Sequence, residues 1–207
     1  MKDVVTISRQ VGTNGEFIAR RVAKLLNFQY FDKTVLLEEA RRMGINVYDA
    51  ESFDFSEDEY KSRGIIGSIF ANKALISAAE EAQISLEGTI IKELAKKGKI
   101  VIVGRGGQAL LRDHPKVLRV KIIAPLVYRV DKLMLDRYIS KSEAEKIIKT
   151  RDKATRQYLD RFYNLDWDAE GNYDAILNLQ RIPIDLAPTY IARLARLARD
   201  ETDREKA

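Results

Sequence analysis

Five short apolar runs, each bounded by turn residues, constrain the fold of this 207-residue chain more than any other feature of its sequence. Short runs of β-branched or aromatic residues are typical of buried strands. Stretches with helical periodicity separate most of these runs, and strands that alternate with helices pair in parallel. The sequence therefore predicts an α/β fold with a five-stranded, doubly wound parallel sheet, whose strands lie near residues 4–8, 28–31, 100–104, 117–123 and 175–179.

The segments between the strands read mainly as helices. Residues 16–26 and 126–138 form two of them, and a capping box at Ser142 and Glu145 opens a helix expected to end near Tyr158. Asp185 can cap a final helix that ends near Asp200. Residues 33–97 form a mostly helical insertion, with helices expected at 34–43, 64–82 and 84–97 and an acidic segment without clear period at 49–58. We expect one domain over residues 1–207, since a chain of this length fits one domain.

Charge and composition exclude several classes of function. The chain has no cysteine and a single histidine, His114, which excludes disulfides, thiolate metal sites and a histidine-rich metal centre. Lysine and arginine number 36 against 31 aspartate and glutamate residues, so the net charge is +5, which suits an anionic ligand. No apolar run approaches the roughly 18–20 residues of a membrane helix, so we expect a cytoplasmic protein without membrane contact.

The turn after the first strand, residues 9–15, is a candidate phosphate-binding loop. In a strand–turn–helix unit, backbone amides and the positive end of the helix dipole can hold a phosphate, and glycines permit the backbone angles that this requires. The sequence lacks the common motif G-x-x-x-x-G-K-[ST]. Aligned to that motif, Arg9 and Asn14 take the glycine positions, Gly15 takes that of the lysine, and Glu16 takes that of the hydroxyl residue. An ordinary strand-to-helix turn is the alternative interpretation.

Several segments, in order along the chain, resemble motifs of the cytidylate-kinase-like family, which is related to the P-loop nucleoside monophosphate kinases. Residues 6–15 resemble its loop "ISRQxGSGG", and residues 31–33 resemble its "YDK". Further along, the chain resembles "VGR" at 103–105, "DHPNVLRV" at 113–120 and "APxxxR" at 124–129, and residues 152–178 follow the C-terminal pattern of the family. Together these segments cover most of the chain.

The resemblance implies a P-loop kinase core, in which residues 33–97 hold the acceptor-binding part and residues 140–163 an arginine-bearing lid. The implied reaction is transfer of the γ-phosphoryl group of ATP, with Mg²⁺, to a nucleoside monophosphate or another phosphorylatable small molecule. Departures from the family pattern leave the acceptor open. Glu38 stands where an arginine is expected, and Thr155 and Tyr158 replace an aspartate and an arginine of the lid.

Phosphoryl transfer depends on positioning and on cations that stabilise spread negative charge, for which the planar guanidinium of arginine is suited. The resemblance carries over Arg105 and Arg129 on the acceptor side, with Arg151 and Arg156 closing over the transferred group from overlapping faces of the lid helix. Ser8, Thr13 and Asp32 are candidate Mg²⁺ ligands, although Asp32 can equally cap the following helix. Nucleotide binding is assigned to the loop and involves Arg9, Gly12, Thr13, Asn14, Gly15 and Glu16. Arg9 is the first candidate to substitute for the missing lysine, and Lys24 is the next.

Two other functions stay open from the sequence. The missing lysine is compatible with a non-catalytic nucleotide-binding sensor. The positive charge, with Arg193, Arg196 and Arg199 at a spacing of three, is compatible with nucleic-acid binding, although the basic residues are dispersed along the chain and disfavour it. The aromatic residues between 158 and 173 are interpreted as packing, with base stacking as the alternative. The sequence does not indicate the oligomeric state.

Overall fold

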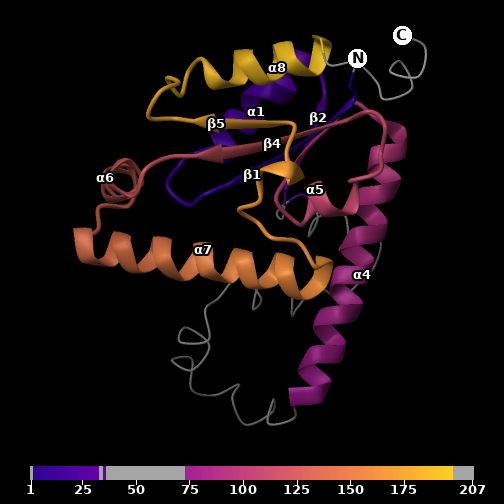
Figure 1. Cartoon of the computed structure of the whole chain (residues 1–207), viewed down its shortest axis with the longest axis horizontal. Helices are drawn as coiled ribbons and strands as arrows, with labels where there is room; N and C mark the ends of the chain where they lie inside the picture. The colour runs from indigo at the N-terminus through magenta and orange to yellow at the C-terminus, as the bar shows by residue number, and fades with distance from the viewer. Residues whose placement is uncertain (1, 33–34, 36–72, 198–207) are drawn as a thin grey trace.

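The protein is described by a computed structural model that covers residues 2–32, 35 and 73–197, with side chains from Ile84 onward in the last stretch. Its strands form one parallel sheet in the order β2-β3-β1-β4-β5 (Figure 1). The strands are β1 (Val4–Arg9), β2 (Gln29–Phe31), β3 (Ile100–Val103), β4 (Val117–Ile123) and β5 (Ala175–Asn178). The predicted five-stranded parallel α/β fold is confirmed. The helix expected at 34–43, the acidic segment and the start of the helix at 64–82 lie outside the described residues.

The central strand β1 is buried on both faces, which is why its residues form a nearly continuous apolar run in the sequence. Val4 pairs in parallel with both Ile100 of β3 and Val117 of β4. Alternate residues of a strand face opposite sides: Val5 and Ile7 enter a core with α1 (Gly15–Leu26) and α8 (Ala187–Leu197), whereas Val4 packs with Ile91 and Ala95 of α4 (Lys73–Lys97). Figure 1 shows α1 and α8 together on one side of the sheet. Because both faces are covered, both sets of side chains are apolar.

Several helix boundaries differ from the prediction. α4 continues through residue 83, where the sequence suggested a break between two helices. A short helix that the sequence did not suggest, α5 (Gly107–Leu110), follows β3. The other elements are α6 (Leu126–Arg137), α7 (Lys141–Tyr163) and a 3-10 turn at Glu170–Asn172. Asp185 pairs with Arg21 at 3.2 Å, just before the start of α8.

The start of α7 corrects the predicted capping box. The N-cap is Ser140, whose hydroxyl accepts a hydrogen bond from the Glu143 amide (3.3 Å) while the Glu143 carboxylate accepts one from the Ser140 amide (2.9 Å). The sequence contains two overlapping S-x-x-E patterns, and the earlier one wins because it places Ile139 and Ala144 at the two ends of a hydrophobic staple. Both residues belong to the apolar cluster between α6 and α7.

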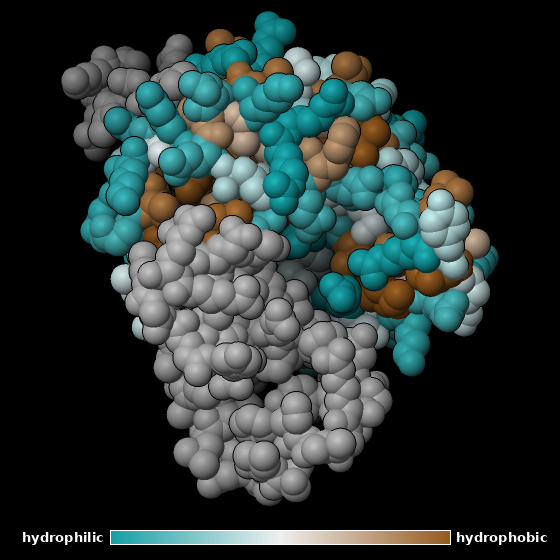
Figure 2. All heavy atoms as spheres, turned by 180° about the vertical axis from the view of Figure 1, so that it is seen from behind, coloured by the Kyte–Doolittle hydropathy of each residue, from teal (hydrophilic) through white to brown (hydrophobic). Residues whose placement is uncertain are grey.

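The coloured part of the face seen in Figure 2 is largely polar. Seen from behind, hydrophilic side chains cover most of the coloured face, with apolar side chains in separate groups among them (Figure 2). No helix in the described ranges is long and apolar enough to cross a membrane.

The sheet topology brings three turns to one edge. In a parallel sheet the carboxyl ends of all strands lie at the same edge, and ligands bind just beyond it. Ile7 of β1 is in register with Val103 of β3, and Arg9 is in register with Ile122 of β4. The turns that follow β1, β3 and β4 are therefore neighbours at this edge.

Candidate active site

A cleft of about 770 Å³ lies at the carboxyl edge of the sheet. Its walls are the turn after β1, the turn after β3, the end of α6 and one face of α7. Of the described residues, five arginines and four carboxylates line it, so charge is concentrated here: Arg9, Arg105, Arg137, Arg151 and Arg161, with Glu16, Asp32, Glu87 and Asp136.

The turn after β1 presents unbonded backbone amides to this cleft. Gly12 and Asn14 have left-handed backbones, with φ of 84° and 51°. Asn14 is the N-cap of α1 but makes no side-chain capping bond. In the part of the chain that the structure describes, no atom accepts a hydrogen bond from the amides of Gly12, Asn14, Gly15 or Glu16. Free amides at a helix N-terminus are the groups that an anion-binding loop requires, so the predicted phosphate site stays a prediction for this turn.

Polar side chains hold the turn in this shape from below. The Gln10 amide donates to the Ile122 carbonyl (3.1 Å), and its side-chain oxygen accepts a hydrogen bond from the Ala124 amide (3.1 Å). The buried Thr13 hydroxyl donates to the Gln10 carbonyl (2.7 Å). The turn is thus fastened to the end of β4, and Thr13 serves its internal structure.

Arg9, the candidate substitute for the missing lysine, packs beside Gly15. A Cβ atom on Gly15 would stand 2.5 Å from Cγ of Arg9, so the arginine stem fills the space where a side chain at position 15 would begin. The guanidinium reaches toward Gly104 in the turn after β3. Its Nε and Nη2 atoms both donate to one Glu16 oxygen, at 3.2 and 2.8 Å. Arg9 therefore brings a positive charge to the mouth of the loop, held by an exposed ion pair.

The three candidate Mg²⁺ ligands are engaged in the fold. The buried Ser8 hydroxyl accepts a hydrogen bond from the indole of Trp167 (2.7 Å). Asp32 accepts hydrogen bonds from Tyr30 (2.8 Å) and from the Val35 amide (3.1 Å), which is the capping role. Among the described residues no three acidic or histidine side chains cluster as a metal site. Thr13 does not line the cleft, whereas Ser8 and Asp32 do, and of these two only Asp32 has the carboxylate oxygens that Mg²⁺ prefers.

Two of the four predicted arginines line the cleft. Arg105 has a left-handed backbone (φ 54°) between Gly104 and Gly106, and its Nη1 atom lies 3.5 Å from the nearly buried Glu87 carboxylate of α4. Arg151 faces the cleft from α7. Because Arg105 is fixed by its turn and by an ion pair, its guanidinium is oriented before any ligand arrives.

The other two predicted arginines lie elsewhere, which corrects the expected site. Arg129 is buried against Asp152 (2.6 Å) under the turn after β1. Arg156 pairs with Asp168 (2.6 Å) and stacks near Trp167, away from the cleft lining. A spacing of five turns a helix by about 140°, so Arg151 and Arg156 cannot share a face. The prediction that their faces overlap is therefore wrong.

Helical periodicity could have added Phe162 to the residues that the sequence indicated on α7. The face of α7 in the cleft carries Arg151, Thr155, Tyr158 and Phe162, at the spacing of one helix face. The expected helix end at Tyr158 hid the last turn, because α7 continues to Tyr163 and brings Arg161 to the cleft. No sequence signal marks Arg137, Asp136 or Glu87, which depend on how α6 and α4 pack.

Most of the aromatic residues after 158 pack the end of α7 onto the sheet. Trp167 and Tyr173 are buried in one cluster, and Tyr158 and Tyr163 pack against it with hydroxyl oxygens 3.2 Å apart. Burial raises the pKa of Tyr173 to about 12, so it stays neutral. Packing is thus the observed role of this cluster, although Tyr158 and Phe162 also line the cleft.

Asp168 joins the segment after α7 to the sheet, and its charge has a testable effect. It accepts hydrogen bonds from Arg156 (2.6 Å) and from the buried Lys121 (2.9 Å). Burial alone would raise the pKa of Asp168, but these bonds outweigh it and hold the pKa below its ordinary value of 3.8. A carboxyl group whose pKa is lower in the folded than in the unfolded protein stabilises the fold at pH values above its unfolded-state pKa. This stabilisation is lost as the pH falls through the folded-state pKa.

We therefore expect Asp168→Asn to lower the urea midpoint at neutral pH, because Lys121 loses its charged partner. The difference in urea midpoint between the variant and wild type should disappear below pH 3.8, as the wild-type carboxyl also becomes neutral. Urea melts of both proteins across this range test the expectation. A gap that persists unchanged in acid would show that the charge of Asp168 is not the cause.

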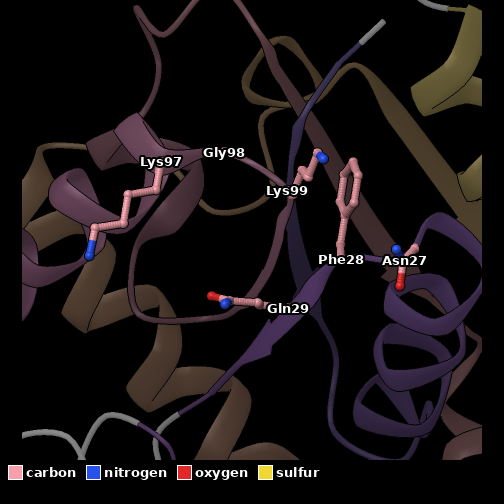
Figure 3. A pocket seen from close by; sticks show the side chains of 6 residues that line it. All are labelled: Asn27, Phe28, Gln29, Lys97, Gly98 and Lys99. Carbon is pink, nitrogen blue, oxygen red and sulfur yellow. The ribbon is translucent and has the colours of Figure 1, made fainter.

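A second hollow, of about 410 Å³, lies at the opposite edge of the sheet, where β2 and β3 begin. Its lining includes Lys97 and Lys99, both exposed. Figure 3 shows these two side chains pointing in different directions rather than toward one point. The hollow therefore lacks the convergent charges of the cleft at the carboxyl edge.

Comparisons with known proteins agree with this fold. The model of the cytidylate kinase-like family matches residues 4–181. Among solved structures, an uncharacterized protein from Eubacterium ventriosum has a TM-score of 0.66 at 20% identity, covering 95% of this chain and 99% of that one. A shikimate kinase from Bacteroides thetaiotaomicron has a TM-score of 0.53 at 15% identity, covering 95% and 100%. A gluconokinase from Sinorhizobium meliloti has 0.50 at 11%, covering 94% of each chain. Identities this low show a shared fold alone. No curated protein sequence matches the chain significantly.

Proposed function

The chain belongs to the cytidylate kinase-like family, and from this premise we propose that it is an ATP-dependent phosphotransferase. It would move the γ-phosphoryl group to a nucleoside monophosphate or a similar small acceptor. Its P-loop kinase fold and its family support a kinase. The observation that carries the proposal is the convergence of free loop amides and cleft arginines at the carboxyl edge of the sheet.

The donor side of the proposed reaction rests on the turn after β1. The amides of Gly12, Asn14, Gly15 and Glu16 are free to bind phosphate oxygens, and the dipole of α1 adds partial positive charge. Arg9 would supply the cation that the missing lysine supplies elsewhere. When bound, ATP supplies the transferable phosphoryl group, and Mg²⁺ neutralises part of its charge. Asp32 could hold the Mg²⁺ or its water ligands.

The acceptor side would be formed by the turn after β3 and by α7. Arg105 and Arg151 can grip an anionic group with two hydrogen bonds each, in a geometry that a lysine cannot reproduce. Tyr158 and Phe162 give this wall an aromatic surface, and Glu87 beside Arg105 offers a carboxylate. We propose that Arg105 holds the acceptor and that Arg151 stabilises the transferred group. Arg129 and Arg156 are assigned no contact with substrate.

Calorimetry with ATP and Mg²⁺ tests the donor site. We expect saturable binding, accompanied by amide chemical-shift changes centred on residues 12–16 in a backbone-assigned NMR spectrum. Binding that shifts amides elsewhere, or no binding at all, would contradict the proposed donor site.

The ion pair between Arg9 and Glu16 should compete with ATP. Both side chains are substantially exposed, so the pair is weak and a phosphate can replace the carboxylate. Glu16→Gln should therefore tighten ATP binding by about two- to five-fold, which is the range that an exposed pair allows. Glu145→Gln, an exposed carboxylate on α7 outside the cleft lining, is the control. Weaker ATP binding in Glu16→Gln would instead indicate that Glu16 holds the metal.

A nucleotide-binding sensor is the second candidate function. The observation that favours it is Gly15 at the lysine position, together with Glu16 drawing the charge of Arg9 aside. A sensor would bind ATP at the same loop but transfer no phosphoryl group, so turnover separates the two functions.

A further inference from the structure

A buried ion pair lies directly beneath the proposed phosphate loop and takes no part in the cleft lining. Arg129 of α6 is 7% exposed and Asp152 of α7 is 4% exposed. Their closest approach is 2.6 Å, from Nη1 of Arg129 to Oδ2 of Asp152. The two residues are 23 positions apart in the sequence, and their ion pair joins α6 to α7. The turn after β1 lies over both residues.

The remaining hydrogen bonds of the pair go to the backbone of the loop and its neighbour. Oδ1 of Asp152 accepts a hydrogen bond from the Val11 amide (3.2 Å), and Nη1 of Arg129 donates to the Val11 carbonyl (3.3 Å). Nε of Arg129 donates to the Ala124 carbonyl (3.1 Å), just after β4. Both polar groups of Val11 are therefore held by this one pair.

Such a pair is poorly explained as a source of stability alone. Removing two charges from water is costly, and apolar residues of similar volume often stabilise a fold equally well. What apolar residues cannot do is bind the amide and the carbonyl of Val11 at the same time. The structure thus separates two roles, filling the space under the loop and orienting its backbone, and only the second requires this pair.

The orientation of Val11 decides which amides of the loop face the cleft. Its amide and carbonyl turn inward to Asp152 and Arg129, whereas the amide of Gly12, the next residue, has no acceptor in the described part of the chain. Gly12 also packs directly on α6, since a Cβ atom there would lie 2.6 Å from the Arg129 carbonyl oxygen. Arg129 contacts the loop through both its side chain and its backbone.

We propose that Arg129 and Asp152 are positioning residues that fix the Val11 peptide and so set the shape of the phosphate loop before a nucleotide binds. The inference rests on the proposed function, because it assumes that the loop binds ATP. It also ties α7 to the loop, so that Arg151, the neighbour of Asp152, has a fixed place relative to the donor site.

The test uses the double variant Arg129→Met with Asp152→Leu in the full chain. The two apolar side chains fill the space without leaving a lone buried charge, so the urea midpoint should stay close to wild type. Affinity for ATP with Mg²⁺, measured by calorimetry, should fall about ten-fold or more, since shifting binding groups by as little as about 1 Å is costly. The matched control is Arg119→Met with Asp174→Leu. This arginine–aspartate pair lies between β4 and the start of β5, away from the cleft, and its replacement should leave ATP affinity unchanged.

A folded double variant that binds ATP within about two-fold of wild type would overturn the proposal, because the pair would then be structural only. If the double variant does not fold, amide hydrogen exchange of the wild-type protein decides. We expect the Val11 amide to be protected without nucleotide, and those of Gly12 and Asn14 only when ATP is added. Exchange at Val11 as fast as at Gly12 would also overturn it. If the wild-type protein does not bind ATP, the proposed function is refuted. Protection of the Val11 amide from exchange would then still show that the Arg129–Asp152 pair holds this peptide.

Discussion

Gly12→Val is expected to abolish ATP binding while the chain stays folded. The backbone of Gly12 has φ of 84°, which a β-branched residue adopts only with strain. A Cβ atom at this position would lie 2.6 Å from the Arg129 carbonyl oxygen and 2.9 Å from its Cβ. Neither neighbour can move easily, because both belong to a helix that the buried pair with Asp152 holds. The loop must therefore shift, and its free amides no longer converge.

We expect ATP affinity to fall roughly 100-fold or more, which corresponds to about 3 kcal/mol. The cost in stability should be about 2–4 kcal/mol, from strain and overpacking together. Gly171→Val is the matched control, since a Cβ at Gly171 meets no atom within 4 Å. Calorimetry and urea melts on both variants check the expectation. ATP affinity equal to wild type in folded Gly12→Val would place the nucleotide somewhere else.

Arg105→Lys and Arg151→Lys should each reduce turnover by about 10³-fold, if both arginines act on the transferred or accepting phosphate. A lysine keeps the charge but cannot donate two parallel hydrogen bonds from a planar fork. Arg105 is also pre-oriented by its left-handed turn and by Glu87, so a flexible side chain there loses positioning as well. Arg151 is partly exposed and should tolerate the change in the folded state.

Arg156→Lys provides the comparison for these two variants, because Arg156 is on the same helix as Arg151 but pairs with Asp168 outside the cleft. We expect its turnover to stay close to wild type. Steady-state kinetics of the three variants, with thermal melts of each, separate catalysis from folding. Turnover equal to that of wild type in Arg105→Lys and Arg151→Lys would refute their assignment. A large loss of turnover in Arg156→Lys would restore the role that the sequence first indicated for it.

The inner strands β1, β3 and β4 were predictable because they are covered on both faces, so that their residues form nearly continuous apolar runs in the sequence. The edge strands β2 and β5 leave Gln29 and Ile176 exposed. The turn between β1 and α1 was predictable too, since its position follows from topology, and Gly12 and Asn14 mark its left-handed backbone angles. The boundaries of α7 were harder. Two overlapping capping boxes compete at its start, and only the packing of Ile139 and Ala144 selects between them.

The roles of the arginines were only half visible in the sequence. Residue type and spacing place Arg129 after β4, but not the carboxylate 23 residues later that takes it out of the cleft. The prediction for Arg156 rested on overlapping helix faces, whereas a spacing of five turns Arg156 about 140° away from Arg151. Conversely, Arg137 and Arg161 reach the cleft through the ends of α6 and α7, where boundaries are least predictable.

The most direct test of the account is transfer of label from ATP radiolabelled at the γ-phosphate. Wild-type protein is incubated with Mg²⁺, labelled ATP and each nucleoside monophosphate in turn, alongside a set of phosphorylatable metabolites, and the products are separated by chromatography. We expect label in at least one acceptor, and loss of that transfer in Arg105→Lys. ATP binding without label in any acceptor would contradict the kinase assignment and favour a nucleotide sensor built on the same loop.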